Sequence, residues 1–177
     1  MRNFIYLIVG LLMVAACNSK PQMETSKKSH PSHKYHYVSI IKENLKYHET
    51  VYAPVYSDIY YLNGTLRYQL TATLSIRNIS LTDTAFVLSA IYYDSYGQKL
   101  RDYTDSTIML QPLESFELVV EQIENQGGAG ANFIIDWGAN KYSNQLMVQT
   151  VMIGTQNNQG VSLLSEAKVI KQEYWKE

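Results

Sequence analysis

The sequence predicts an all-β fold, an immunoglobulin-like antiparallel β-sandwich of about eight strands. From Tyr35 onward, short segments rich in Val, Ile, Thr, Tyr and Phe alternate with Gly, Asn, Asp and Pro, as strands alternate with turns. Residues 70–77 alternate strictly between apolar and polar side chains. No long segment has helical periodicity. Many short strands with short connections favour two packed sheets, and a closed barrel with a ligand cavity is the alternative.

The clearest strand lies within residues 66–79, and one of its faces is apolar. That face consists of Leu70, Ala72, Leu74 and Ile76. Just before it, Asn63-Gly64 supplies the two positive-φ positions of a type I′ turn, which predicts a hairpin. The other strands are expected at residues 51–56, 86–93, 99–103, 115–123, 132–137, 146–153 and 161–170. Because one cysteine cannot form an inter-sheet disulfide, Trp137 is expected to anchor the core.

Residues 1–16 are predicted to be a lipoprotein signal peptide. The apolar run over residues 4–16 has the length of a signal-peptide core and is shorter than the ~20 residues that span a bilayer. It ends in Val14-Ala15-Ala16-Cys17, which resembles a bacterial lipobox, the motif whose cysteine is acylated after cleavage in front of it. An ordinary signal peptide and an uncleaved anchor are the alternatives. The single cysteine of the chain stands at this position, which favours lipidation of Cys17.

The predicted anchor places the protein in the bacterial cell envelope, on the periplasmic or surface side of a membrane. Asn18, which follows the cysteine where inner-membrane lipoproteins of enteric bacteria carry aspartate, favours the outer membrane. Residues 17–34 are polar, contain two prolines and lack apolar periodicity, so they are expected to form a flexible tether. The sandwich domain is then residues 35–177.

Three histidines at the end of the tether suggest a metal site as an alternative function. His30, His33 and His36 recur at every third residue, and neutral imidazole is a common ligand of Zn²⁺, Cu²⁺ and Ni²⁺. Pro31 excludes a regular helix that would present all three on one face, and no neighbouring acid or thiol completes a coordination set. A soluble linker is the simpler interpretation, so no metal and no cofactor are expected.

Catalytic arrangements are scarce, and we expect no enzymatic activity. The sequence contains neither a Gly-x-Ser-x-Gly elbow nor a His-Glu-x-x-His zinc motif, and lipidation would consume the single thiol. Asp94, Asp102 and Asp105 cluster around a predicted turn and support an envelope hydrolase as a further alternative. Aspartates that form turns are the ordinary explanation. A net charge of −1 argues against nucleic acid as a partner.

Two local features bear on binding. The segment Gly127-Gly128-Ala129-Gly130-Ala131-Asn132 lacks the Gly-Lys-Ser/Thr end of a phosphate loop and precedes a strand, so a tight connection is expected. Tyrosine is frequent, with 15 residues, and suits either a face that binds sugars or proteins or a half-buried strand. The tyrosines in question are Tyr52, Tyr56, Tyr60, Tyr61, Tyr68, Tyr92, Tyr93, Tyr96 and Tyr103.

Several phrases in order resemble a bacterial domain-of-unknown-function family, number 3124. They are Tyr52-Ala53-Pro54-Val55-Tyr56-Ser57-Asp58-Ile59-Tyr60, Ala72-Thr73-Leu74-Ser75-Ile76-Arg77-Asn78, Tyr92-Tyr93-Asp94-Ser95-Tyr96-Gly97, the segment from Gly127 to Trp137, and Val151-Met152-Ile153-Gly154-Thr155 with Gln159-Gly160-Val161-Ser162. The resemblance covers residues 51–170 and implies one uncharacterised domain, often exported or lipid-anchored. It assigns no activity and no site. The function expected is therefore a lipid-anchored extracytoplasmic binding or structural protein, whose partner is an envelope protein or glycan.

Overall fold

The computed structural model describes residues 34–124, 126–142, 144–156 and 159–174. The described residues from Tyr35 on form one compact unit. Cys17, His30 and His33 lie outside the described residues, so the signal peptide, the lipidation site and most of the tether remain predictions. Within the described ranges, no helix is both long enough and apolar enough to span a membrane.

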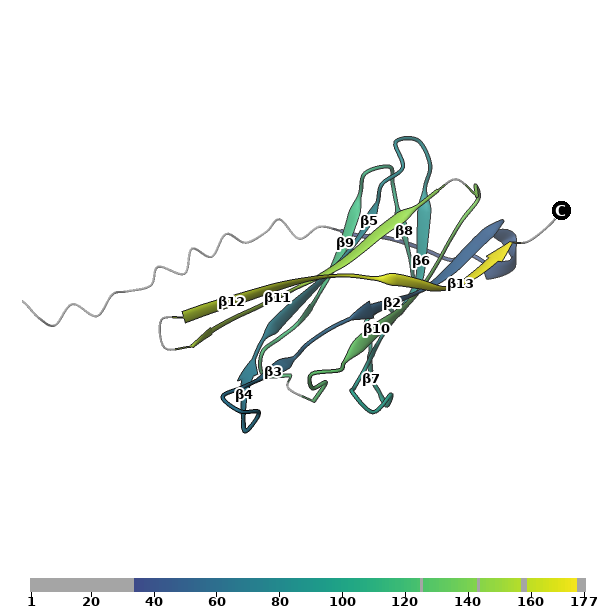
Figure 1. The fold of residues 1–177 in the computed structure, drawn as a ribbon. Helices are drawn as coiled ribbons and strands as arrows, with labels where there is room; N and C mark the ends of the chain where they lie inside the picture. Colours follow the sequence, from purple (N-terminus) through teal and green to yellow (C-terminus); the bar gives the residue numbers. More distant parts are fainter. Residues whose placement is uncertain (1–33, 125, 143, 157–158, 175–177) are drawn as a thin grey trace, which may run out of the picture. The chain divides into compact units, whose positions relative to one another are not determined.

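The described residues from Tyr35 on form two antiparallel sheets and one separate hairpin (Figure 1). The larger sheet has the order β1-β8-β6-β10-β2-β13, with β7 paired to β6. Its strands are β1 (His36–Val38), β2 (Tyr47–Pro54), β6 (Ala85–Tyr93), β7 (Lys99–Asp102), β8 (Thr107–Leu110), β10 (Asn132–Ala139) and β13 (Lys168–Tyr174). A single 3₁₀ turn, Lys42–Asn44, precedes β2 in this described part.

The smaller sheet has the order β12-β11-β5-β9, and the hairpin consists of β3 and β4. The strands concerned are β3 (Asp58–Tyr61), β4 (Leu66–Gln69), β5 (Thr71–Asn78), β9 (Ser115–Val120), β11 (Leu146–Gln156) and β12 (Gln159–Glu166). Strands β12 and β13 follow each other directly, so the chain crosses from the smaller sheet to the larger one at Ala167. The architecture is an antiparallel β-sandwich, as predicted, and not a closed barrel.

The core lies between the inner faces of the two sheets. In β5 the predicted apolar face is buried, with Leu70 just before the strand and Ala72, Leu74 and Ile76 within it exposed by no more than 1%. Across from it, Phe133, Ile135 and Trp137 of β10 are fully buried. Alternation at period two therefore positions both inner faces, because successive side chains of a strand point to opposite sides. The prediction that Trp137 anchors the core is confirmed.

The structure corrects the strand count, which is 13 in the described residues rather than about eight. Two strands of three and four residues, β1 and β8, are too short to produce a detectable alternation. The segment predicted as one strand at 66–79 is two, because β4 pairs with β3 in the hairpin whereas β5 pairs with β9 and β11 in the smaller sheet. The segment at 161–170 is likewise two strands, β12 and β13, in different sheets.

The hairpin predicted at Asn63-Gly64 is present as β3 and β4. Asn63 and Gly64 have φ values of 50° and 78°, and the amide of Thr65 donates to the carbonyl of Leu62 (3.2 Å). The strands end one pair earlier than a two-residue loop allows, at Tyr61 and Leu66, but the register is that of the predicted turn. As a result Tyr60 lies directly opposite Arg67.

Candidate functional site

A cleft of about 340 Å³ lies where the β3–β4 hairpin, the β6–β7 turn and the β9–β10 connection meet. All three connections lie at the same end of the sandwich (Figure 1). We call this the hairpin cleft. The residues that line it are Tyr60, Arg67, Ser95, Tyr96, Gln126, Gly127, Gly128, Ala129 and Gly130.

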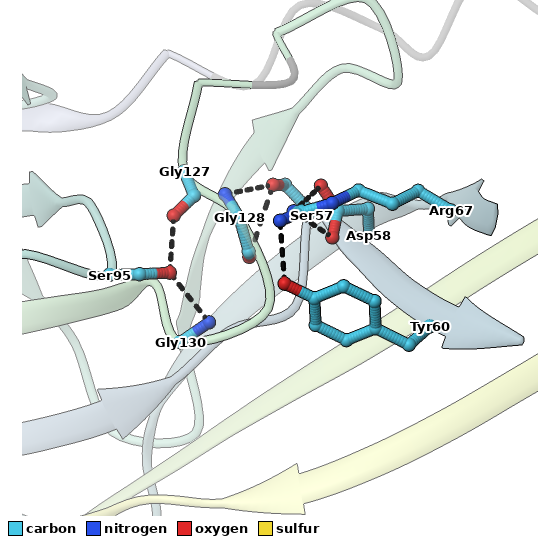
Figure 2. Close-up of polar contacts among 8 residues, drawn as sticks. All are labelled: Ser57, Asp58, Tyr60, Arg67, Ser95, Gly127, Gly128 and Gly130. Atoms are coloured by element: carbon cyan, nitrogen blue, oxygen red, sulfur yellow. Dashed lines mark hydrogen bonds and ion pairs between the residues drawn. The ribbon is translucent and has the colours of Figure 1, made fainter. Parts of the chain in front are cut away.

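Two serine side chains fix the glycine-rich segment that forms one wall. The hydroxyl of Ser57 accepts a hydrogen bond from the amide of Gly128 (2.7 Å), and the hydroxyl of Ser95 accepts one from the amide of Gly130 (2.8 Å). Ser95 Oγ also donates to the carbonyl of Gly127 (2.9 Å). Figure 2 shows this arrangement. Because the serines occupy the amides of Gly128 and Gly130, the segment is a tight connection, as expected, and does not present these two amides to a phosphate.

Two of the glycines are required by space and conformation. Gly128 has a φ of +78°, and a Cβ on it would lie 2.7 Å from Ser95 Oγ. A Cβ on Gly127 would overlap the hydroxyl of Tyr92, which is buried beneath the segment. The wall of the cleft therefore has a close, fixed contact with the core, and larger residues would displace it.

Arg67 is held in the cleft by Asp58 and Tyr60 (Figure 2). Its Nη1 donates to both carboxylate oxygens of Asp58 (2.8 and 2.9 Å), and its Nη2 donates to the hydroxyl of Tyr60 (2.6 Å). The guanidinium carbon also lies 4.5 Å from the centroid of the Tyr60 ring, a cation–π contact. The Asp58 side chain is only 5% exposed, while that of Arg67 is 49% exposed. The hydrogen bonds to Asp58 raise the pKa of the Arg67 guanidinium above its ordinary value.

Two aromatic side chains of the cleft project into solvent. Tyr60 is 56% exposed and Tyr96 is 89% exposed. Tyr96 stands in the turn after β6, where Asp94 Oδ1 accepts hydrogen bonds from the amides of Tyr96 and Gln98 (both 2.8 Å). Gly97 completes the turn with a φ of +78°. The backbone that carries Tyr96 is therefore fixed, although its ring is free of the core.

The sequence matches the family described as "Protein of unknown function (DUF3124)" over residues 48–170. The chain belongs to this family. All the residues that line the hairpin cleft fall inside the DUF3124 match. Among curated proteins, none matches the chain. A solved structure, described as "Crystal Structure of Thermotoga maritima 1070", is 15% identical, with a TM-score of 0.39, over 73% of this chain and 95% of that one.

Two of the three aspartates considered for a hydrolase have separate structural contacts in this DUF3124 domain. Asp94 accepts two amides in its turn, and Asp102 pairs with Lys99 (2.6 Å). Asp105 is exposed in the connection between β7 and β8. None of the three lines the hairpin cleft.

The histidines that the structure describes do not come together. His36 is exposed in β1, and His48 is buried in β2, 2% exposed. Across the described residues, no group of three or more His, Cys, Asp or Glu side chains is placed to hold a metal ion.

The tyrosines divide between the core and the surface rather than forming one binding face. Tyr92 is buried, and Tyr68 and Tyr103 pack against the core. Tyr52 and Tyr93 are half-buried on strands of the larger sheet. Tyr60 and Tyr96 alone of the nine considered line the hairpin cleft.

The sequence patterns did not indicate the polar residues that line the cleft, Arg67, Ser95 and Gln126, or those that hold its lining in place, Ser57 and Asp58. One of them carried a signal, because the Asn63-Gly64 turn implies that Tyr60 faces Arg67 across the hairpin. Ser57 and Ser95 act on residues 71 and 35 positions away in the chain, and no local pattern reports such contacts.

Proposed function

We propose that this DUF3124 protein is a lipid-anchored lipoprotein of the bacterial cell envelope, whose sandwich binds an envelope component without catalysing a reaction. The observation that carries the proposal is the hairpin cleft, which is lined by two exposed tyrosines, a fixed arginine and the rigid glycine-rich segment. Concave sites with a few placed polar groups and aromatic rings are typical of recognition.

The contacts of the cleft residues support binding rather than catalysis. A nucleophilic serine needs a neighbouring base, whereas Ser57 and Ser95 are engaged with the backbone of Gly127, Gly128 and Gly130. Asp58, the carboxylate that follows Ser57 in the chain, has both oxygens on Arg67. These residues therefore hold the cleft in shape, and its exposed groups remain available to a partner.

The anchor is supported by the lipobox that ends in Cys17. Several acyl chains, each contributing ~0.8 kcal/mol per buried methylene, would hold the protein stably on a membrane, whereas one chain would not. The sequence around Asn18 favours the outer membrane, and the domain would then face the periplasm or the cell surface.

Labelled palmitate tests the anchor. Cells expressing the wild-type chain should incorporate label into the protein and retain it in the membrane fraction, and Cys17→Ala should lose both. Equal release of the two forms as soluble exported protein, with no label in either, would exclude lipidation.

Affinity capture from the native envelope tests the binding function. The full-length protein should retain an envelope component that Tyr96→Ala loses, because Tyr96 contributes an exposed ring to the cleft. Tyr37→Ala is a matched control, since Tyr37 is 62% exposed on β1, outside the cleft. A set of captured components that is the same for all three proteins would argue against a binding role for the cleft.

A further inference from the structure

We propose that the hairpin cleft binds an uncharged saccharide, with a sugar ring against the exposed tyrosines and its hydroxyls on Arg67 and Gln126. This inference rests on the binding function proposed above and names the class of ligand. It follows from the charge, the aromatic surface, the hydrogen-bonding groups and the size of the cleft.

The charge balance of the cleft disfavours an ionic ligand. Arg67 is the single charged side chain among the described lining residues, and its charge is already matched by the buried carboxylate of Asp58. An anion would be repelled by that carboxylate, which lies behind the guanidinium. The amides of Gly128 and Gly130, which could otherwise donate to an anion, donate to the two serines instead. A cation would meet Arg67. A neutral ligand avoids the cost of taking an uncompensated charge out of water.

The exposed tyrosines supply the apolar part of the site. Tyr96 leaves 89% of its surface in water and Tyr60 leaves 56%, although both stand on fixed hairpins. The axial C–H groups of a pyranose form an apolar face that packs on an aromatic ring and meets its negative π surface. Tyrosine gives this contact at low entropic cost, because only two χ angles are ordered.

The polar groups of the cleft match vicinal hydroxyls. Arg67 has five N–H donors, of which the Nη1 pair points to Asp58 and one on Nη2 to Tyr60. The Nε donor and the second Nη2 donor have no partner among the described residues. Because the Tyr60 hydroxyl accepts from Arg67, its own hydrogen is directed elsewhere, and the exposed carboxamide of Gln126 adds a donor and an acceptor. Sugar hydroxyls, which both donate and accept, can satisfy all of these groups.

The size of the cleft limits the ligand to a short stretch of glycan. A volume of about 340 Å³ stands at the lower end of the ~300–1,000 Å³ that small-molecule sites occupy. A disaccharide is therefore a suitable probe.

The test uses the full-length protein in detergent and isothermal titration with three neutral disaccharides: N,N′-diacetylchitobiose, cellobiose and maltose. Inorganic phosphate serves as the anionic comparison. At least one disaccharide should bind, Tyr96→Ala should weaken that binding at least tenfold, and Tyr37→Ala should leave it unchanged. Gln126→Ala, a change at an exposed side chain, should weaken it severalfold. Circular dichroism verifies that each variant is folded.

Three results would overturn the proposal: no binding of any of the three disaccharides, binding that Tyr96→Ala leaves intact, or tighter binding of phosphate. The capture experiment separates this failure from failure of the binding function. If the sugars fail while Tyr96→Ala still loses a captured envelope component, the cleft binds a ligand that is not a neutral saccharide. If Tyr96→Ala also loses nothing, the binding role proposed for the cleft is wrong as well.

Discussion

At the scale of single residues, Asn78 connects separate parts of the chain through one buried carboxamide. The residue is 1% exposed, and its Nδ2 donates to the carbonyls of Asp83 (2.7 Å), Leu110 (3.1 Å) and Gln111 (3.0 Å). Its Oδ1 accepts from the amide of Ser80 (3.1 Å). A side chain with both a donor and an acceptor group is needed here, because buried carbonyls without a donor are costly.

The change Asn78→Asp should therefore destabilise the fold although it conserves shape. Aspartate offers no donor when ionised, so it would turn three attractions into contacts between oxygens, at a cost of about 2–4 kcal/mol in the free energy of unfolding. Urea denaturation measures this. Asn140→Asp is the matched control, because Asn140 is exposed, and it should change stability by less than about 0.5 kcal/mol. An Asn78→Asp protein as stable as the control would contradict the role assigned to the carboxamide.

A second residue-scale prediction concerns acid. His48 is 2% exposed, and burial lowers the pKa of its imidazole below the ordinary value of 6.5, with the charge of Lys42 acting in the same direction. The unfolded chain therefore binds a proton at this residue more readily than the folded one as the pH falls below about 6.5. Stability should decrease there, by at most about 1.4 kcal/mol per pH unit.

Denaturation of the wild-type chain and of His48→Gln between about pH 7 and pH 5 measures this contribution. His48→Gln should have a flatter dependence on pH across that interval, because the replacement does not titrate. If the free energy of unfolding depends on pH equally in the two proteins, His48 does not contribute to the loss of stability in acid.

At the scale of secondary-structure elements, Glu49 fastens the last strand to the sandwich. On β2, its Oε2 accepts from the indole of the buried Trp137 (2.9 Å). Its Oε1 accepts from the hydroxyl of Tyr47 and from the side chain of Gln172 on β13 (2.8 Å). Strand β13 is at the edge of the larger sheet, where it pairs with β2 across a register shift between Val169 and Lys171.

Replacing Glu49 or Gln172 should weaken the attachment of β13, and the two changes should differ in their cost. Glu49→Leu leaves the buried indole N–H of Trp137 without an acceptor, so it should cost about 1–3 kcal/mol. Gln172→Ala should cost less than about 1 kcal/mol but should accelerate amide hydrogen exchange in β13. Lys168→Ala, on the same strand and exposed, is the control. Unchanged exchange in β13 for Gln172→Ala and Glu49→Leu alike would mean that the backbone ladder alone holds the strand.

The elements also show which parts of the fold the sequence could predict. Long strands with one buried face, such as β5 and β10, can be predicted from the sequence because alternation at period two follows directly from burial. The passage from β12 to β13 cannot be recognised in this way, since no Gly, Pro, Asn or Asp marks it while the pairing partner changes. The amide of Ala167 still donates to the carbonyl of Val148 on β11 (3.0 Å), and Lys168 already pairs with Tyr52 on β2. The partner of a strand is a long-range property.

The hairpin cleft likewise has parts that the sequence indicates and parts that it does not. Its tyrosines and its glycines are conspicuous in the sequence, and the turn at Asn63-Gly64 implies the contact of Tyr60 with Arg67. The cleft itself forms because the sandwich brings three connections to one end, which depends on the order of strands in both sheets. A sequence pattern reports burial and local turns but not that order.

At the scale of the whole molecule, tyrosines that pack on or near the core make the folded state sensitive to alkali. Burial raises the pKa of Tyr92 to about 12, and burial together with the charge of Glu124 raises that of Tyr103 to about 12. Burial and the hydrogen bond with Glu49 raise the pKa of Tyr47 as well, near another part of the larger sheet. The ordinary pKa of all three is 10.0.

The sign of the effect follows from proton binding. Between about pH 10 and pH 12 the unfolded chain has lost these phenolic protons while the folded chain retains them, so stability is complete below about pH 10 and decreases as the pH rises. Each tyrosine contributes a slope of at most about 1.4 kcal/mol per pH unit.

Tyr103→Phe keeps the ring, which lies 5.2 Å from that of Phe133, and removes one titrating hydroxyl. Denaturation at about pH 8 and about pH 11 should therefore show that Tyr103→Phe loses less free energy of unfolding in alkali than the wild type does. The difference should be roughly the contribution of one titrating phenol. An equal loss in both proteins would exclude Tyr103 from the alkaline transition.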